Sequence, residues 1–146
     1  MKTLIITEKP SVAQAIAAVV GAITRKDGYF EGNGYVVGWC LGHLAQLVNA
    51  EAYDPRLSRW RVSDLPILPH DWRYRVPQEK RKQFGILRGL MLRDDVSQVI
   101  NACDAGREGE LIFRNLYELT GCTKPTLRLW LNSMEDSEIR RALGDL

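Results

Sequence analysis

Hydrophobic and polar positions change period along the chain, and the change predicts strands and helices in turn. Residues 3–7 (TLIIT) form a short apolar run of mainly β-branched residues, which is typical of a buried strand. Pro10 then breaks the strand, and residues 11–20 have helical spacing. Ser11 is the expected cap of this helix and Gly21 its expected stop.

A turn signal and a long irregular segment follow. Residues 32–34 (GNG) stand between the runs YFE and YVVGWC, which predicts a β-hairpin. Residues 49–77 carry four prolines and no clear period, so we expect an extended excursion there. A helical pattern returns from Gln78 to Asp95. Its expected buried face consists of Phe84, Leu87, Met91 and Leu92.

The last third of the chain repeats the alternation. Residues 97–104 (SQVINACD) predict a strand, and residues 108–121 predict a helix that Gly121 closes. Residues 125–131 (PTLRLWL) predict a further strand, and a final helix starts with Ser133 or Asp136 as its cap. Strands that alternate with helices indicate βαβ units, and therefore an α/β fold with a mainly parallel sheet flanked by helices.

Size and composition agree with one domain over residues 1–146. The chain is 45% hydrophobic, and no window approaches the length of a membrane-spanning helix, so we expect a soluble protein without a membrane partner. The apolar run at the N-terminus is too short for a signal peptide. The three cysteines lack zinc-ligand spacing and are odd in number, which favours reduced thiols in a cytoplasmic protein.

Charge is distributed unevenly. The whole chain carries a formal net charge of +2, yet residues 56–93 hold ten Lys or Arg against three acids, a net charge of +7. Trp60, Trp72 and Tyr74 are interleaved with the arginines. Cations mixed with aromatic side chains suit a single-stranded nucleic acid, although an ordinary solvated face explains the charges equally well.

Two carboxylates that are distant in sequence are expected at one edge of the sheet. Glu8 ends the first predicted strand, and Asp104 ends the strand that begins near Ser97. Functional groups of such sheets collect beyond the carboxyl ends of the strands.

The segment DAGREGE adds further charges beside Asp104. Glu108 follows four residues later, and carboxylates that meet repel one another unless a cation neutralises them. Oxygen ligands of this kind select Mg²⁺, while Lys9 and Arg107 suit a phosphate. The alternative is a solvated turn in which Asp104 caps the helix and Glu108 favours its dipole. Glu110 points elsewhere on the helix and is equally well explained as a surface acid.

Four segments together resemble a known family. They are LIITEKPSVAQAIA, GHLAQL, CDAGREGELIFR and LRLWLNSMEDSEI, and in this order they look like the Toprim domain of type IA DNA topoisomerases, in particular the bacterial topoisomerase III branch. The resemblance spans the whole chain and implies the Toprim fold, a Rossmann-like α/β sheet. It also implies that the chain is the N-terminal fragment of a larger topoisomerase.

The Toprim signature is a Glu after the first strand and Asp-x-Asp-x-Glu after a later one. Glu8 matches the first part, and Asp104 and Glu108 match the outer members of the second. The middle position is Gly106, which departs from the pattern and implies a weaker metal site, or one ion where relatives hold two. A water molecule or Glu110 in place of the middle acid is a hypothesis.

The resemblance implies a transesterification, in which a tyrosine attacks one DNA strand, a second strand passes and the break is resealed. By the match, Glu8 would be the general acid/base at the departing 3′-oxygen and would share in the metal site. Lys9 would hold the scissile phosphate, and Asp104 with Glu108 would hold Mg²⁺.

Two further residues are assigned to DNA. Apart from the family match, we expect Arg107 to bind phosphate or to orient a carboxylate. His43, in the GHL segment, is expected to contact the DNA backbone, with a buried, hydrogen-bonded histidine as the alternative.

The nucleophilic tyrosine of the family lies in a later domain, and none of the five tyrosines here matches its context. The expected partners are therefore DNA, chiefly single-stranded, and the remaining domains of the same polypeptide, including the tyrosine domain. The expected location is the bacterial cytoplasm, in association with the nucleoid.

Other functions are also compatible with the sequence. A free-standing Toprim nuclease would use metal-bound water in place of tyrosine. A primase-like Toprim protein would bind nucleotides, and a non-catalytic DNA-binding module would have a degenerate metal site. A dinucleotide-binding domain fits least, because GNG at 32–34 lies in a hairpin and not between a strand and a helix.

Overall fold

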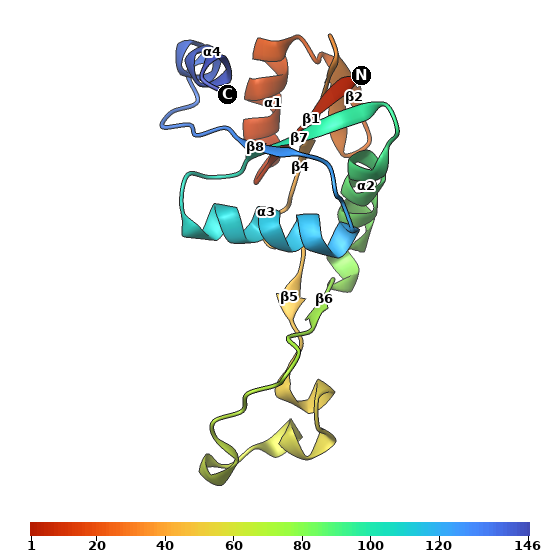
Figure 1. The fold of residues 1–146 in the computed structure, drawn as a ribbon, viewed down its shortest axis with the longest axis vertical. Helices are drawn as coiled ribbons and strands as arrows, with labels where there is room; N and C mark the ends of the chain where they lie inside the picture. The colour runs from red at the N-terminus through yellow and green to blue at the C-terminus, as the bar shows by residue number, and fades with distance from the viewer.

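In the computed structural model, which describes residues 1–146, a six-stranded sheet lies between two pairs of helices (Figure 1). The strand order is β2-β3-β4-β1-β7-β8. Neighbouring strands among β4, β1, β7 and β8 run parallel, and β2 and β3 are added antiparallel. The strands are β1 (Lys2–Thr7), β2 (Thr24–Lys26), β3 (Tyr29–Gly32), β4 (Tyr35–Trp39), β7 (Val96–Ala102) and β8 (Thr126–Arg128). The predicted mainly parallel α/β sheet and the hairpin at 32–34 are confirmed.

Helices cover both faces of the sheet. α1 (Pro10–Val20) and α4 (Asp136–Gly144) pack on one face, and α2 (Arg81–Leu92) and α3 (Arg107–Thr120) pack on the other (Figure 1). Side chains alternate along β1, so that Ile5 packs with α1 while Leu4 and Ile6 pack with α2 and α3. This alternation gives the molecule two apolar layers. No helix has both the length and the apolar character that crossing a bilayer requires.

The first helix begins one residue earlier than its predicted cap. Lys9 is the N-cap, without a side-chain hydrogen bond, and Pro10 occupies the first helical turn. Proline suits this position because its missing N–H would have no partner there. The prediction that Ser11 caps the helix is therefore wrong. Gly21 ends the helix in the left-handed conformation (φ 78°), as predicted.

The buried face of α2 differs from its prediction at Leu92, and it also includes Gln83. Leu87 and Met91 are buried and Phe84 is partly buried, but Leu92 is 44% exposed and Leu90 is buried in its place. Residues 83, 87 and 90 lie on one helical stripe, and Leu92 lies beyond its edge. The segment before Arg81 is a short 3₁₀ helix, η4 (Gln78–Lys80).

The C-terminal elements are shorter than their patterns suggest. β8 covers only three residues of the predicted strand, because it pairs with β7 alone at the edge of the sheet. α4 has Glu135 as its N-cap, so neither Ser133 nor Asp136 caps it as predicted. α3 ends at Gly121 in the left-handed conformation (φ 71°), as predicted.

Residues 48–73 form an arm that leaves the sheet region through a small two-stranded ribbon, β5 (Gln46–Leu47) and β6 (Tyr74–Arg75) (Figure 1). The arm contains the 3₁₀ helices η1 (Ala50–Ala52), η2 (Pro55–Arg59) and η3 (Val62–Asp64), and it has no buried residue. Trp60 and Trp72 are more than half exposed. The predicted basic excursion is thus a solvent-exposed extension.

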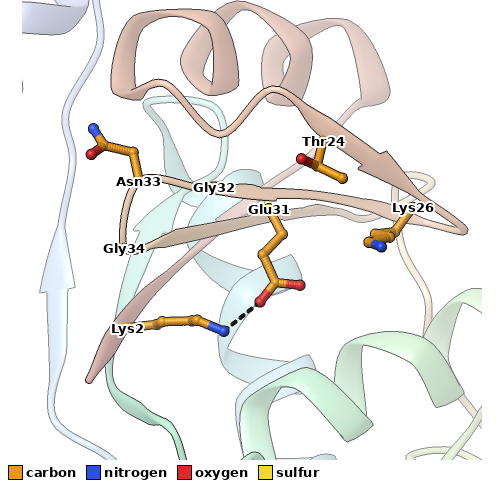
Figure 2. A pocket seen from close by; sticks show the side chains of 7 residues that line it. All are labelled: Lys2, Thr24, Lys26, Glu31, Gly32, Asn33 and Gly34. Carbon is orange, nitrogen blue, oxygen red and sulfur yellow. Dashed lines mark hydrogen bonds and ion pairs between the residues drawn. The ribbon is translucent and has the colours of Figure 1, made fainter.

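At the end of the sheet where β1 and β7 start, four charged side chains form a closed network. Lys2 Nζ lies 2.7 Å from Glu31 Oε1 (Figure 2) and 2.8 Å from Asp95 Oδ2. Arg93 Nη2 lies 2.8 Å from Glu31 Oε1 and 2.7 Å from Asp95 Oδ2. Hydrogen bonds from Arg93, and to a lesser extent from Lys2, lower the pKa of the Glu31 and Asp95 carboxyl groups below their ordinary values.

Candidate active site

The carboxyl ends of β1 and β7 bring Glu8 and Asp104 to the same edge of the sheet. The two strands are paired in parallel up to Thr7 and Ala102, so the residues that follow them emerge side by side. Lys9 lies between the two acids: its Nζ is 2.8 Å from Asp104 Oδ2 and 3.8 Å from Glu8 Oε1. The Glu8 side chain is 13% exposed and that of Asp104 46% exposed. One acid is thus set into the edge, and the other faces solvent.

The segment after β4 folds over the same edge and carries His43. Cys40 N donates to Thr7 O at 2.7 Å and Gly42 N donates to Glu8 O at 3.4 Å, so this segment lies against the end of β1. His43 Nε2 is 3.1 Å from Glu108 Oε1, in the first turn of α3. The His43 side chain is 40% exposed, so the alternative of a buried histidine does not describe it.

Each exposed acid of this edge is held by a basic side chain. The hydrogen bond to Asp104 and its charge, with a further contribution from Glu8, raise the pKa of Lys9 above its ordinary value, so Lys9 remains a cation. Three carboxylates supply the hard oxygen donors that Mg²⁺ prefers. They are nevertheless paired with Lys9 and His43, and no group of three His, Cys, Asp or Glu side chains is arranged as a metal site.

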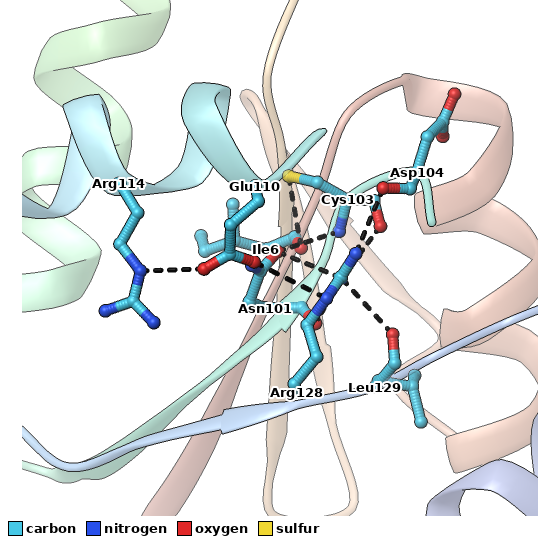
Figure 3. Close-up of polar contacts among 8 residues, drawn as sticks. All are labelled: Ile6, Asn101, Cys103, Asp104, Glu110, Arg114, Arg128 and Leu129. Carbon is cyan, nitrogen blue, oxygen red and sulfur yellow. Dashed lines mark hydrogen bonds and ion pairs between the residues drawn. The ribbon is translucent and has the colours of Figure 1, made fainter. Parts of the chain in front are cut away.

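Arg107 and Glu110 occupy different positions around the start of α3. Arg107 is exposed and forms no side-chain hydrogen bond or ion pair. Glu110 accepts from Asn101 Nδ2 of β7 at 2.8 Å and from Arg114 Nε at 2.7 Å, and its Oε2 lies 3.6 Å from Arg128 Nε of the edge strand β8 (Figure 3). The Asp104 carboxylate points away from this cluster (Figure 3). Glu110 therefore does not stand in for the acid that Gly106 replaces.

Arg128 fixes the backbone of the Asp104 turn. Its guanidinium donates to the carbonyl oxygens of Asn101 (3.0 Å), Cys103 (2.8 Å) and Asp104 (3.0 Å) (Figure 3). It also lies 5.2 Å from the ring centroid of Trp130. Sequence reasoning missed this residue; the available signal was one arginine in the otherwise apolar strand LRLWL, whose end lies at the functional edge.

Gly109 is the glycine that this turn requires. A Cβ at Gly109 would lie 2.1 Å from Asp104 O and 2.9 Å from Asp104 N, so the first turn of α3 packs directly on the Asp104 backbone. A Cβ at Gly106 would meet nothing within 4 Å. The close backbone contact of this segment is therefore at Gly109 and not at Gly106.

Two of the three free cysteines lie under this edge. Cys40 follows β4, Cys103 precedes Asp104, and both are buried, as is Cys122. Hydrogen bonding with Cys40, together with burial, raises the pKa of the Cys103 thiol far above its ordinary value. All three cysteines are free and buried, and a neutral thiol is a poor nucleophile.

Comparison with known proteins gives concordant results. The Toprim domain family matches residues 3–134. The chain is 41% identical over 145 residues to DNA topoisomerase 3 of Bacillus anthracis, covering 99% of this chain and 20% of that protein. It is 42% identical over 146 residues to DNA topoisomerase 3 of Staphylococcus aureus (strain NCTC 8325 / PS 47), with 100% and 20% coverage.

A solved structure supports the fold. The full-length topoisomerase I from Thermotoga maritima superimposes with a TM-score of 0.63 at 20% identity, covering 97% of this chain and 20% of that one. The chain spans about a fifth of the length of the relatives it matches. Because the family match takes in both the Glu8 strand and the Asp104 turn, this chain belongs to the Toprim domain family.

Proposed function

We propose that this chain works as the Toprim domain of a type IA DNA topoisomerase, where it supplies the acidic site for transient cleavage and rejoining of one DNA strand. The observation that carries the proposal is the contact of Lys9 with both Glu8 and Asp104 at the carboxyl edge of the sheet. These residues lie in a chain that is 41% identical over nearly its whole length to DNA topoisomerase 3. The function requires the rest of the polypeptide, including the domain with the nucleophilic tyrosine.

Glu8 and Lys9 are the proposed catalytic pair. Glu8 is the most enclosed acid of the site and would exchange a proton with the 3′-oxygen of the cleaved strand. The raised pKa of Lys9 keeps it cationic, which suits binding of the scissile phosphate. Both residues are fixed by the end of β1, so a phosphate bound by Lys9 would lie within reach of Glu8.

Asp104, Glu108 and Glu8 would hold Mg²⁺. The ion would neutralise the acids and polarise a phosphate oxygen. To bind it, Asp104 would release Lys9 and Glu108 would release His43. The released Lys9 and His43, together with Arg107, would then be available to the DNA backbone.

The basic arm supports DNA as the partner, chiefly in single-stranded form. Arg59 and Arg61 flank the exposed Trp60, and stacking of unpaired bases on such rings is tolerant of sequence. Neutralised phosphates release counterions, so binding should weaken as salt increases. The bacterial cytoplasm, close to the nucleoid, is the corresponding location.

Calorimetric titration with MgCl₂ tests the metal site. We expect Asp104→Asn and Glu108→Gln each to weaken Mg²⁺ affinity about tenfold, since each removes one charged oxygen ligand. Glu118→Gln, on an exposed part of the same helix, is the matched control and should bind as the unchanged chain does. Unchanged affinity in both site variants would remove the proposed metal site.

DNA cleavage tests the remainder of the proposal. These 146 residues with Mg²⁺ or Mn²⁺ should leave single-stranded and supercoiled DNA intact, because none of their five tyrosines matches the context of the family's nucleophile. Metal-dependent cutting that is lost in Asp104→Asn would instead establish a self-sufficient nuclease. In a longer protein that includes the tyrosine, Glu8→Gln should keep folding and single-strand binding but abolish cleavage.

A further inference from the structure

A cavity of about 370 Å³ lies beside the acidic edge, between α3, the segment after β4 and the ribbon at the base of the arm. Its lining residues are His43, Ala45, Gln46, Leu47, Tyr74, Leu111 and Asn115. His43 belongs both to this cavity and to the acidic edge, because its Nε2 is 3.1 Å from Glu108 Oε1. The cavity and the proposed cleavage site are therefore contiguous.

The chemistry of the lining suits a flat, neutral and partly polar group. Tyr74 supplies an aromatic ring, and Leu47 and Leu111 supply apolar surface that is 43% and 47% exposed. Gln46 and Asn115 carry amides that both donate and accept hydrogen bonds. No acid or permanently charged side chain lines the cavity.

The direction of α3 relates the cavity to the acids. Glu108, Leu111 and Asn115 are spaced three and four residues apart, so they follow one stripe of the helix. At 1.5 Å per residue, Asn115 lies about 10 Å along the helix from Glu108. A strand held by its phosphate at the acidic edge can thus extend along α3 and place a neighbouring base in the cavity.

The ribbon positions the aromatic side of the cavity. Leu47 and Tyr74 are directly paired across β5 and β6, which holds the ring opposite the leucine. Arg73 and Arg75 flank Tyr74 in sequence, and strand alternation directs them away from the ring. Arg73 is engaged with Tyr53, whose ring centroid is 4.5 Å from its guanidinium, whereas Arg75 forms no ion pair and is available to a phosphate.

We propose that this cavity binds one unpaired nucleobase of the DNA strand whose phosphate is held at the Glu8–Lys9–Asp104 edge. The inference rests on the proposed function and adds a position at which the strand is gripped through its base. Stacking on Tyr74 and contact with Leu111 hold the base, and the amides of Gln46 and Asn115 meet its polar edge. Because amides both donate and accept, the cavity accepts more than one base.

The test compares intact single-stranded oligonucleotides with fully abasic strands of the same length, by fluorescence anisotropy on the whole 146-residue chain. Stacking of one base corresponds to a preference for the intact strand of roughly tenfold. We expect Tyr74→Ala to remove most of this preference. Leu111→Trp should do the same by filling the cavity while leaving Tyr74 in place, and both positions tolerate change because they are exposed.

Matched variants separate the cavity from other contacts. Leu119→Ala changes an exposed leucine on α3 outside the cavity and should keep the preference. Trp60→Ala and Trp72→Ala remove the exposed rings of the arm. If these two variants abolish the preference while Tyr74→Ala and Leu111→Trp retain it, bases stack on the arm and the proposal is overturned. Equal binding of intact and abasic strands by the unchanged chain also overturns it.

Failure of this proposal can be told apart from failure of the acidic site. The cavity variants should leave Mg²⁺ affinity unchanged, since neither Tyr74 nor Leu111 supplies one of the three carboxylates. Lost metal binding in Asp104→Asn with an intact base preference would support both proposals. Intact metal binding without base preference would retain the acidic site and reject the base cavity.

Discussion

The two ends of the parallel sheet differ in how their charged side chains are balanced. At the amino end, two cations and two carboxylates form a closed network in which Lys2 and Arg93 each contact Glu31 and Asp95. At the carboxyl end, the three acids have two basic neighbours. Lys9, which is always charged, contacts Glu8 and Asp104, and His43 contacts Glu108. The first end is neutral by itself, whereas the second is left with an excess of acids.

The difference supports the proposal that the carboxyl end binds a ligand. Paired charges at the amino end hold β1, β3 and the start of β7 together and leave little for an external ion. Unbalanced carboxylates repel one another and favour a bound cation. The carboxyl end also has its backbone fixed by Arg128 and Gly109, so its acids are held by groups that are not themselves ligands.

The largest expected effect is that of Gly109→Ala at the carboxyl end. An added Cβ would overlap Asp104 O at 2.1 Å, so either the helix or the turn must move. We expect the free energy of unfolding to fall by about 2–3 kcal/mol, as for other overpacked sites, together with loss of Mg²⁺ binding. Urea unfolding and calorimetric titration measure the two quantities.

Gly89→Ala in α2 is the control for that experiment. Its Cβ would meet nothing within 4 Å, and alanine favours helix by about 1 kcal/mol over glycine, so this variant should be as stable as the unchanged chain or more so. Equal stability of the two alanine variants would show that α3 does not press on the Asp104 turn.

Arg128→Lys should reduce Mg²⁺ affinity more than it reduces the stability of the fold. A lysine ammonium cannot donate to the three carbonyl oxygens that the guanidinium reaches, so the Asp104 turn loses its fixed geometry. Mutation of a group that orients a metal ligand typically lowers metal affinity by about 10–100-fold, and we expect Mg²⁺ affinity here to fall by about tenfold.

The measurement is calorimetric titration alongside thermal unfolding. Arg140→Lys, on the exposed side of α4, is the control and should change neither quantity. A large fall in thermal stability of Arg128→Lys at unchanged Mg²⁺ affinity would make Arg128 a purely structural residue.

The stability contributed by the charged network at the amino end should depend on pH and not on metal ions. Arg93 and Lys2 lower the folded pKa of Glu31 and Asp95 from ordinary values of 4.5 and 3.8. Such carboxylates stabilise the fold above their unfolded pKa, and this stabilisation is lost as the pH falls through the lower folded pKa. The free energy of unfolding should therefore decrease as the pH is lowered below about 4.5.

Arg93→Gln should make that decrease shallower. At pH 7 we expect it to cost about 1 kcal/mol, a value suited to a partly exposed network, and to leave Mg²⁺ affinity unchanged. Denaturant unfolding at a series of pH values gives the slope. A variant with the same acid sensitivity as the unchanged chain would exclude the network as its source.

The smallest effect is expected for Ser11→Ala, close to the carboxyl end of β1. Ser11 lies inside α1 and makes no capping hydrogen bond, so the free energy of unfolding should change by less than about 0.5 kcal/mol. Loss of a true N-cap would cost about 1 kcal/mol. A decrease of that size in chemical unfolding would restore Ser11 as the cap.

The order of the elements and the edge at which the acids meet follow from local sequence signals. Gly21 and Gly121 end their helices in the left-handed conformation, and GNG makes the hairpin, because these are local backbone requirements. The parallel sheet then follows from the alternation of elements, and it brings Glu8 and Asp104 together.

The details of the site could not be predicted in this way, because they depend on distances between segments far apart in the chain. Arg128 reaches the Asp104 turn only once β8 pairs with β7, and Glu110 meets Arg128 only once α3 packs against the sheet. The cavity combines the segment after β4, the base of the arm and α3. Periodicity describes which face of an element is buried, but which neighbours that face meets is fixed only when the elements pack.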